Sequence, residues 1–312
     1  MSIEVPPVRL SLVLTACAAL LGVCLGSFLN VCILRWGAEP KQSVVHPPSR
    51  CPGCGRGLSW YDNVPVVSWL VLRGRCRGCG EPISIQYPLV ELGTAIIWGY
   101  FAWRHGLSME ALRDAVFGTL LLGIAMTDAR EYIIPNEFTY GGMALGLLLS
   151  VPGGPRELVG SLQGIIFGAG FLYLIGALGS FLARRDAMGG GDIAMMAMVG
   201  AFLGWQSVLA TIFGGACIGV MLHVLSLALA RQHPAPAALA TAPATAQAPD
   251  PVGGPAPAPT TDPEFKTKED LRAEGYLPFG VSLAIAASLI VLVDARGAIV
   301  AWFGSYADSL GL

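Results

Sequence analysis

The chain has 312 residues, of which 54% are hydrophobic and only 13% are charged, against about 25% charged residues in a typical soluble domain. Its 19 Lys and Arg residues and 21 Asp and Glu residues leave a net charge of −2, which excludes the strongly basic surface of DNA- and RNA-binding proteins. Several apolar runs approach the ~20 residues that a helix needs to cross a bilayer. The composition therefore predicts an all-α polytopic membrane protein that contacts lipid.

Eight apolar runs are candidates for transmembrane helices. They cover residues 9–34, 88–103, 111–127, 138–151, 159–182, 193–203, 207–230 and 276–293. The fourth and sixth runs are shorter than a full crossing, so each must use flanking residues or line a cavity. With eight crossings, all but five of the 19 basic residues fall on one side. The positive-inside rule makes that side cytoplasmic and places both termini outside.

These runs divide the chain into five predicted parts. They are a first transmembrane helix (1–34), a cytoplasmic loop domain (35–87), a membrane core (88–230), a linker (231–264) and a last transmembrane helix with the C-terminus (265–312). The linker is rich in Pro and Ala and has almost no large apolar residue, so it cannot bury enough surface to offset the entropy of ordering. We predict a disordered cytoplasmic tether, with a polyproline docking segment as the alternative.

The eight cysteines form two groups. The first group lies inside apolar runs, where small hydrophobic side chains are expected to pack: Cys17, Cys24, Cys32 and Cys217. The second group forms two Cys-x-x-Cys pairs in the basic loop, 21 residues apart, each with a Gly just after it: Cys51, Cys54, Cys76 and Cys79.

The doubled Cys-x-x-Cys pattern predicts a zinc site. Two residues between the thiolates and a Gly after them let the backbone turn and present both sulfurs to one tetrahedral ion. Four Cys ligands leave no open position for catalysis, so the metal is expected to be structural and to fold the loop. The alternative is a pair of disulfides, which a reducing cytoplasm disfavours.

Two aspartates stand at predicted helix ends on the cytoplasmic side. Asp128 ends the third apolar run, and Pro135 stops the helix from continuing beyond it. Asp192 begins the sixth run and follows three glycines, among them Gly189 and Gly191, which let a substrate chain come close. An ionisable group at membrane depth is a functional-site hypothesis, whereas one at the interface can simply cap a helix, as Asp192 could.

Two carboxylates that meet around one water have a defined chemistry. They cannot easily both ionise, so one keeps its proton while the other acts as a base, as in aspartic proteases. The sequence offers no His-Glu-x-x-His helix, Gly-x-Ser-x-Gly elbow or Ser/His/Asp set to compete with this prediction. A proton-coupled transporter or a membrane scaffold could also hold paired aspartates near helix ends, and on the residues alone it stays an alternative.

These features together are those of a known family. The segments that match are 26–32, 60–70, 83–91, 189–192 and 278–280, with both cysteine pairs and the segment that holds Asp128 and Pro135. Through them the chain resembles the bifunctional type IV prepilin peptidases, membrane aspartyl proteases of the Gly-x-Gly-Asp class. The resemblance covers nearly the whole chain apart from the linker.

The resemblance implies an enzyme of the bacterial inner membrane with two activities. Asp128 and Asp192 would cut the leader from prepilins and pseudopilins of type IV pili and type II secretion at the cytoplasmic face. S-adenosylmethionine would then methylate the new N-terminal amine, and the zinc-bearing loop is characteristic of members that do so. A peptidase without methyltransferase activity is the alternative. No residues of this sequence predict the methyl-donor site.

The chain departs from the family pattern at two positions. The family usually has Lys two residues after its second catalytic Asp, and this chain has Ala194 there. Val281 replaces the Pro that usually follows the segment at 278–280. A missing cation leaves the protonation of the aspartate pair open, while both carboxylates needed for hydrolysis remain.

Overall fold

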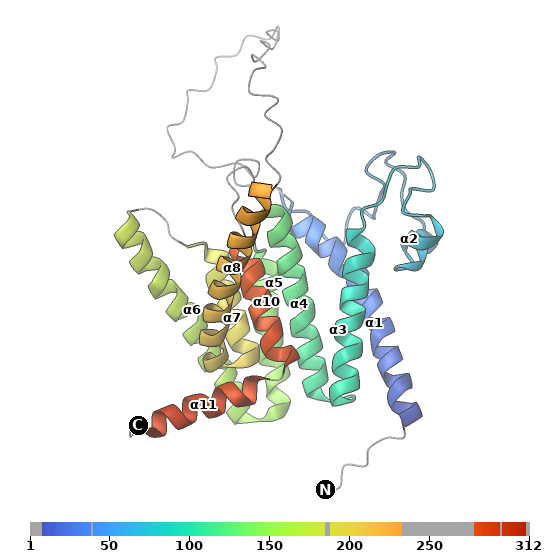
Figure 1. Ribbon diagram of the computed structural model, residues 1–312. Helices are drawn as coiled ribbons and strands as arrows, with labels where there is room; N and C mark the ends of the chain where they lie inside the picture. Colours follow the sequence, from blue (N-terminus) through green and yellow to red (C-terminus); the bar gives the residue numbers. More distant parts are fainter. Residues whose placement is uncertain (1–7, 39, 185–187, 233–277, 294, 310–312) are drawn as a thin grey trace, which may run out of the picture. The chain divides into compact units, whose positions relative to one another are not determined.

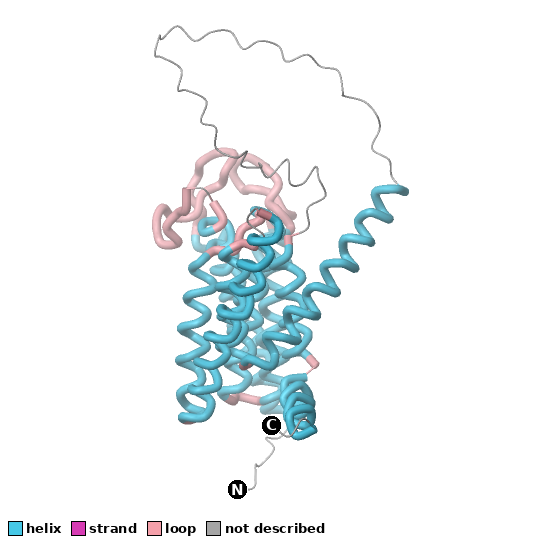
Figure 2. Tube along the Cα trace, turned by 90° about the vertical axis from the view of Figure 1, so that its left-hand side faces the viewer, coloured by secondary structure: helices cyan, strands magenta, loops and turns pink. Residues whose placement is uncertain are grey.

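The computed structural model describes residues 8–38, 40–184, 188–232, 278–293 and 295–309. Within these ranges all regular secondary structure is helical, and Figure 2 shows helices and loops without a strand. The cysteine loop also contains two isolated antiparallel β-bridges, which pair Arg50 with Gly57 and Arg75 with Pro82. The all-α prediction is confirmed.

Each of the eight predicted runs forms a helix (Figure 1). They are α1 (Val8–Trp36), α3 (Gln86–His105), α4 (Met109–Glu131), α5 (Asn136–Ser150), α6 (Pro155–Ala183), α7 (Gly190–Leu203), α8 (Trp205–Gln232) and α10 (Phe279–Leu292). The loop between α1 and α3 adds the 3-10 helix η1 (Trp60–Asn63) and the short α2 (Val67–Val71), and η2 (Val151–Gly153) follows α5. A further helix, α11 (Ala295–Ser309), was not predicted, because its apolar stretch is short and interrupted by polar residues.

Fewer helices than eight are long and apolar enough to cross a membrane by themselves. Among the described residues these are Leu10–Trp36, Pro155–Ala183 and Trp205–Ser226, and α10 with α11 makes a fourth only as a broken span. Helices α5 and α7 have 15 and 14 residues, short of the ~20 that a full crossing needs. A multi-pass membrane protein follows from these helices, and the count of eight crossings stays a prediction.

Contacts divide the chain into two units, Met1–Ile218 with Pro278–Leu312, and Gly219–Leu277. The described part of the second unit is the C-terminal half of α8. All but the first two residues of the predicted linker at 231–264 lie outside the described residues.

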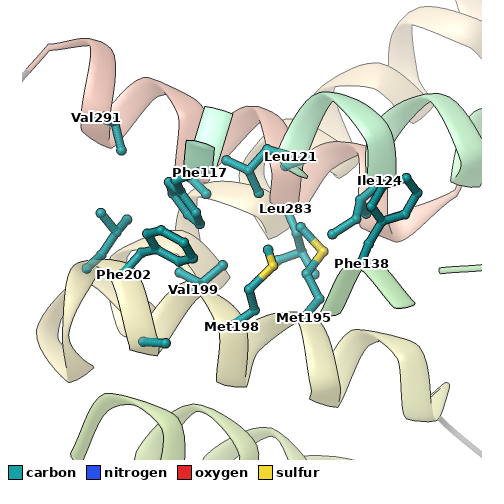
Figure 3. Packing of buried hydrophobic residues seen from close by; sticks show 14 of the residues in the cluster. Phe117, Leu121, Ile124, Phe138, Met195, Met198, Val199, Phe202, Leu283 and Val291 are labelled. Atoms are coloured by element: carbon teal, nitrogen blue, oxygen red, sulfur yellow. The ribbon is translucent and has the colours of Figure 1, made fainter. Parts of the chain in front are cut away.

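Helix α7 forms the centre of the first unit. Every residue of α7 from Ala194 to Leu203 is buried, and the helix packs against α5, α6 and α10. Phe117 of α4 stacks on Phe202 of α7 with ring centroids 4.7 Å apart. Figure 3 shows the side chains of α4, α5, α7 and α10 that meet here: Phe117, Leu121, Ile124, Phe138, Met195, Met198, Val199, Phe202, Leu283 and Val291.

The contact between α6 and α7 depends on glycine. A Cβ atom added at Gly164 would lie 2.0 Å from the carbonyl oxygen of Gly200, and one added at Gly200 would lie 2.0 Å from that of Gly164. In a bilayer, lipid tails are as apolar as the side chains, so helices associate through close packing of small residues. These two glycines therefore let the backbones of α6 and α7 touch.

Candidate active site and metal centre

The end of α4 places the first aspartate. Asp128 lies in the last turn of α4 and is only 5% exposed. The helix ends at Tyr132, which takes a left-handed conformation (φ 57°) and donates its backbone N–H to the carbonyl oxygen of Asp128. The chain then runs extended into Pro135, the N-cap residue of α5. The predicted stop of the helix before Pro135 is confirmed.

The N-terminus of α10 closes over the Asp128 carboxylate. The backbone N–H of Val281 donates to Oδ2 of Asp128 at 3.0 Å, across 153 residues of sequence. The first N–H groups of a helix have no partner within the helix and favour an anion. Gly280 allows this approach, because a Cβ atom there would lie 2.7 Å from the same oxygen. The segment at 278–280 thus has a structural role that the sequence did not reveal.

Asp192 lies in the first turn of α7, half-buried. The N-cap residue of α7 is Gly189, so the alternative that Asp192 caps this helix is wrong. A Cβ atom at Gly191 would lie 3.0 Å from Cβ of Ile134, the residue before Pro135. The glycine-rich start of α7 therefore packs directly against the segment that follows Asp128.

Three segments that are distant in the sequence meet at this point. The side chain of Ile134 contacts Gly191 at the start of α7 and Gly280 at the start of α10, and Gly280 in turn touches Asp128. Asp128, in the last turn of α4, and Asp192, in the first turn of α7, therefore lie on the two segments that Ile134 joins. The structure therefore brings together all five residues predicted for this site: Asp128, Pro135, Gly189, Gly191 and Asp192.

The two carboxylates have different surroundings. Asp128 accepts a backbone N–H from α10, whereas within the described part of the chain no hydrogen bond reaches the side chain of Asp192. Asp128 is buried and Asp192 is half-buried. An unequal environment of this kind separates the acid from the base in a carboxylate pair.

The four loop cysteines also converge. The Sγ atoms of Cys51, Cys54, Cys76 and Cys79 all lie within 4.8 Å of one another. Cys51 and Cys79 have their Sγ atoms 3.7 Å apart, far beyond the ~2.05 Å of a disulfide, and all four cysteines are free thiols. The disulfide alternative is therefore not what the structure contains.

The two cysteine pairs have nearly the same backbone. In the first, Gly55 donates its N–H to the carbonyl oxygen of Cys51, and in the second Gly80 donates to that of Cys76, both at 2.9 Å. Both glycines have positive φ, 67° and 75°. The positive φ is the reason that each Cys-x-x-Cys pair needs Gly after its second Cys.

The donor set fits a zinc ion. A tetrahedral zinc with Zn–S bonds of ~2.3 Å separates its sulfurs by roughly 3.8 Å, close to the 3.7 Å between Cys51 and Cys79. The backbone N–H groups of Cys79 and then Gly78 lower the pKa of the Cys76 thiol to about 6, whereas, against the backbone N–H of Glu81, burial and the neighbouring thiols raise the pKa of Cys79 to about 12. A thiolate at neutral pH is the form that binds metal. The zinc prediction is thus compatible with the geometry.

A buried carboxylate that the sequence analysis did not single out joins the loop to the helices. Glu91 of α3 is 5% exposed, and its Oε2 accepts the backbone N–H of Val66 at 2.7 Å. Val66 has a left-handed backbone (φ 60°), which is uncommon for a β-branched residue. Lys41 of the loop also pairs with Glu137 of α5 at 2.8 Å. The cysteine loop and the N-terminus of α5, where the segment that follows Asp128 ends, therefore lie at the same end of the helices.

Comparison with known proteins decides the family. Residues 20–105 match the model of the bacterial peptidase A24 N-terminal domain, and residues 115–224 match that of the type IV leader peptidase family. The chain belongs to the type IV leader peptidase family. The first match covers α1 from residue 20 onward, the cysteine loop and α3, and the second covers both aspartates. The transporter and scaffold alternatives are therefore wrong.

The chain is also similar to proteins named prepilin leader peptidase/N-methyltransferase, of which three are described. The protein of Myxococcus xanthus is 40% identical over 69% of this chain and 64% of its own length. That of Pseudomonas aeruginosa is 35% identical over 68% and 81%, and that of Neisseria gonorrhoeae is 32% identical over 69% and 83%. The chain thus covers slightly less than two thirds of the Myxococcus protein and more than four fifths of the other two. No solved structure matches the chain.

Proposed function

We propose that the protein is a membrane aspartyl endopeptidase that removes the leader peptide of type IV prepilins and pseudopilins and then methylates the new N-terminus with S-adenosylmethionine. The observation that carries the peptidase half is that Ile134 and the N-terminus of α10 bring the end of α4, which holds Asp128, against the start of α7, which holds Asp192. Family membership and the names of the relatives support both halves.

In this proposal the two aspartates divide the work of hydrolysis. Asp128 accepts an N–H from α10, which stabilises its charged form, so we assign it the role of the base that takes a proton from the attacking water. Asp192 starts protonated and transfers its proton to the scissile carbonyl oxygen as the water oxygen forms the new bond to the carbonyl carbon. When the C–N bond breaks, the proton taken by Asp128 passes to the leaving amine, and Asp192 recovers a proton from a hydroxyl of the intermediate as the C=O bond re-forms.

The glycine-rich segment gives the substrate its access. Gly189 and Gly191 precede Asp192 and have no side chains, and the segment between α4 and α5 packs against this start of α7 through Ile134. An extended substrate can then lie with its scissile bond beside both carboxylates. Substrate positioning of this kind accounts for a large share of rate enhancement in hydrolases.

Zinc has a structural role in this proposal. Cys51, Cys54, Cys76 and Cys79 would occupy all four positions of a tetrahedral ion and fold the loop, so no catalytic step passes through it. S-adenosylmethionine supplies the methyl group: an N–C bond forms at the new amine, the S–C bond breaks, and the amine proton leaves to solvent.

We further propose the bacterial inner membrane as the location, with the active site at the cytoplasmic face. The positive-inside rule supports this orientation. The ion pair between Lys41 and Glu137 supports it as well, because it holds the basic loop beside the N-terminus of α5, close to the segment that follows Asp128. Prepilins, pseudopilins and lipid are then the expected partners, and nucleic acid is not.

A single reaction tests the proposal. Purified protein is incubated with a prepilin that carries its leader, with and without S-adenosylmethionine, and the mass of the pilin N-terminus is followed. We expect loss of the leader in both reactions and a gain of one methyl group only with the methyl donor. An intact leader would contradict the peptidase, and cleavage without methylation would leave a peptidase alone.

A further inference from the structure

The short helix α2 of the cysteine loop has its apolar side chains on the outside. Val67, Leu70 and Val71 stand at positions i, i+3 and i+4, which places them on one face of the helix. Each is more than half exposed, Leu70 to 62% and Val71 to 69%. A surface helix that is surrounded by water has the opposite arrangement, with polar residues on its outer face.

The hydrogen-bonding side chains of α2 point into the loop instead. Ser68 is buried and donates its hydroxyl to the carbonyl oxygen of Tyr61, and the indole N–H of Trp69 donates to that of Ile83 at 3.1 Å. The bond to Tyr61 holds η1 against α2. Trp60, in the same helix η1, is 81% exposed. This part of the loop therefore exposes its apolar side chains and buries its polar ones.

The start of α2 lies beside the helices rather than beyond their ends. The N–H of Val66, the residue before α2, reaches Glu91, five residues after the start of α3 and thus ~7 Å along that helix. A Cβ atom at Gly26 of α1 would lie 2.7 Å from Cα of Glu91, and Gly26 is ten residues, or ~15 Å, before the end of α1. Figure 1 also shows α2 level with the first turns of α3.

The two helices expose apolar side chains at this same level. Phe28 of α1 and Leu89 and Leu92 of α3 are all exposed, and they lie within two residues of Gly26 or Glu91. Helix α1 is long and apolar enough to cross a bilayer by itself. Exposed apolar side chains on such a helix are expected to face lipid. A bilayer that covers them also extends to the start of α2.

Two arginines follow α2 directly. Arg73 and Arg75 are both exposed. Arginines next to a membrane-facing apolar segment extend toward the phosphates of anionic lipids, and Trp is enriched at the boundary between lipid and water. Exposed apolar residues, an exposed Trp and adjacent cations together are typical of a segment that lies in the plane of the membrane surface.

We propose that the cysteine loop contacts the bilayer through this face. Val67, Leu70 and Val71 insert among the acyl chains at the membrane interface, and Arg73 and Arg75 bind the phosphates of anionic lipids. The loop is then attached to the membrane by α2 as well as by α1 and α3, which limits its orientation relative to the membrane surface. The inference needs the membrane location of α1 and none of the proposed chemistry.

The experiment measures the surroundings of position 70 in the full-length protein, reconstituted in vesicles of phosphatidylcholine and phosphatidylglycerol. A fluorescent amino acid replaces Leu70, because seven native Trp residues would obscure the emission of an added one. The same amino acid at position 81 is the control, since Glu81 is an exposed, charged residue of the same loop. Zinc content and protease resistance show that the loop of each variant is folded.

Two quenchers distinguish lipid from water. Nitroxides on the acyl chains quench a fluorophore inside the bilayer, and iodide quenches one in water. We expect the nitroxides to quench position 70 about threefold or more above position 81, and iodide to show the reverse order, because an interfacial segment is buried ~5–10 Å in the membrane. Val67→Ser with Val71→Ser should bring position 70 closer to position 81 in both measurements, because these changes remove apolar area that the bilayer buries.

The arginines are tested with labelled headgroups. A nitroxide on phosphatidylglycerol should quench position 70 about twofold more than one on phosphatidylcholine, because Arg73 and Arg75 concentrate the anionic lipid near α2. Arg73→Gln with Arg75→Gln should abolish this preference. Arg156→Gln should keep it, because Arg156 is exposed in the first turn of α6, which begins just after α5 ends at the side of the helices away from the loop.

The other outcomes overturn the inference. If iodide reaches position 70 as freely as position 81 and the acyl-chain nitroxides quench neither, the face lies in water. A position 70 that is shielded from both quenchers would mean that protein, such as a second copy of the chain, covers the face instead of lipid. Equal quenching by the two labelled headgroups would contradict the role of the arginines. None of these results bears on leader cleavage or methylation, which the prepilin reaction tests separately.

Discussion

The helical core around α7 and the cysteine loop are stabilised in different ways. Ten consecutive residues of α7 are buried, and aromatic and methionine side chains of the neighbouring helices fill the space around them. In the described loop, residues 40–85, only Cys51, Ser68 and Gly74 are buried. Such a loop cannot be held by apolar burial alone, because a fold this small needs a metal or a cross-link.

This difference predicts which change destabilises each region. The core should tolerate loss of metal and fail when its close helix contacts are disturbed. The loop should behave in the opposite way. Because Glu91 and Lys41 tie the loop to α3 and α5, the two regions touch without sharing the source of their stability.

The largest effect is expected from removal of zinc. Structural zinc provides on the order of 10 kcal/mol of folding free energy in small domains, so chelation or Cys51→Ser with Cys54→Ser should unfold the loop. Limited proteolysis with metal analysis measures this, and Cys217→Ser, outside the loop, is the control. Absence of zinc in pure protein, or a loop equally resistant to protease after chelation, would contradict the metal prediction.

Loss of either aspartate should affect chemistry without affecting either region's stability. Asp128→Asn and Asp192→Asn should each lower leader cleavage by roughly a thousandfold or more, because one carboxylate cannot be acid and base in the same step. Rates come from single-turnover assays with enzyme in excess, and thermal unfolding checks the fold. Substantial cleavage by either variant would defeat the assignment.

The contact between α6 and α7 gives a test confined to the core. Gly200→Ala places a Cβ atom 2.0 Å from the backbone of Gly164, so it should destabilise the bundle by about 1–3 kcal/mol. Gly170→Ala, in α6 like Gly164 but with no atom within 4 Å of the added Cβ, should have little effect. Thermal unfolding in detergent compares the two, while zinc content should stay constant. Equal stabilities would mean that the close contact is not required.

Much of this architecture could be predicted from local patterns. Apolar runs predicted the positions of eight helices, Pro135 predicted the end of α4, and the doubled Cys-x-x-Cys spacing predicted the thiol cluster. Each of these signals lies within a short stretch of sequence, where periodicity, backbone restriction or ligand spacing acts directly.

The contacts between distant segments could not be predicted in this way. The N–H of Val281 reaches Asp128 from 153 residues away, and Glu91 caps the strained backbone of Val66 from another element. Neither contact leaves a local pattern. The residue that caps α7 was also left open, because three glycines in a row do not determine where the helix begins.

The smallest effect is expected from shortening the linker. Deletion of most of residues 234–259 should leave cleavage and zinc content nearly unchanged, because an Ala- and Pro-rich chain with no core can be shortened while its ends still reach. The assay is leader cleavage at matched expression. If activity disappears while expression holds, the linker is a docking element.

The central claim is that Asp128 and Asp192 act as one unit on one water, and a double-mutant cycle tests it most directly. Single-turnover leader cleavage is measured for the wild type, Asp128→Asn, Asp192→Asn and the double variant, all with bound zinc and unchanged thermal unfolding. Residues that act as a unit are strongly non-additive, so the double variant should be no more than a few-fold slower than the slower single variant. Losses that multiply in the double variant would show two independent groups and contradict the dyad.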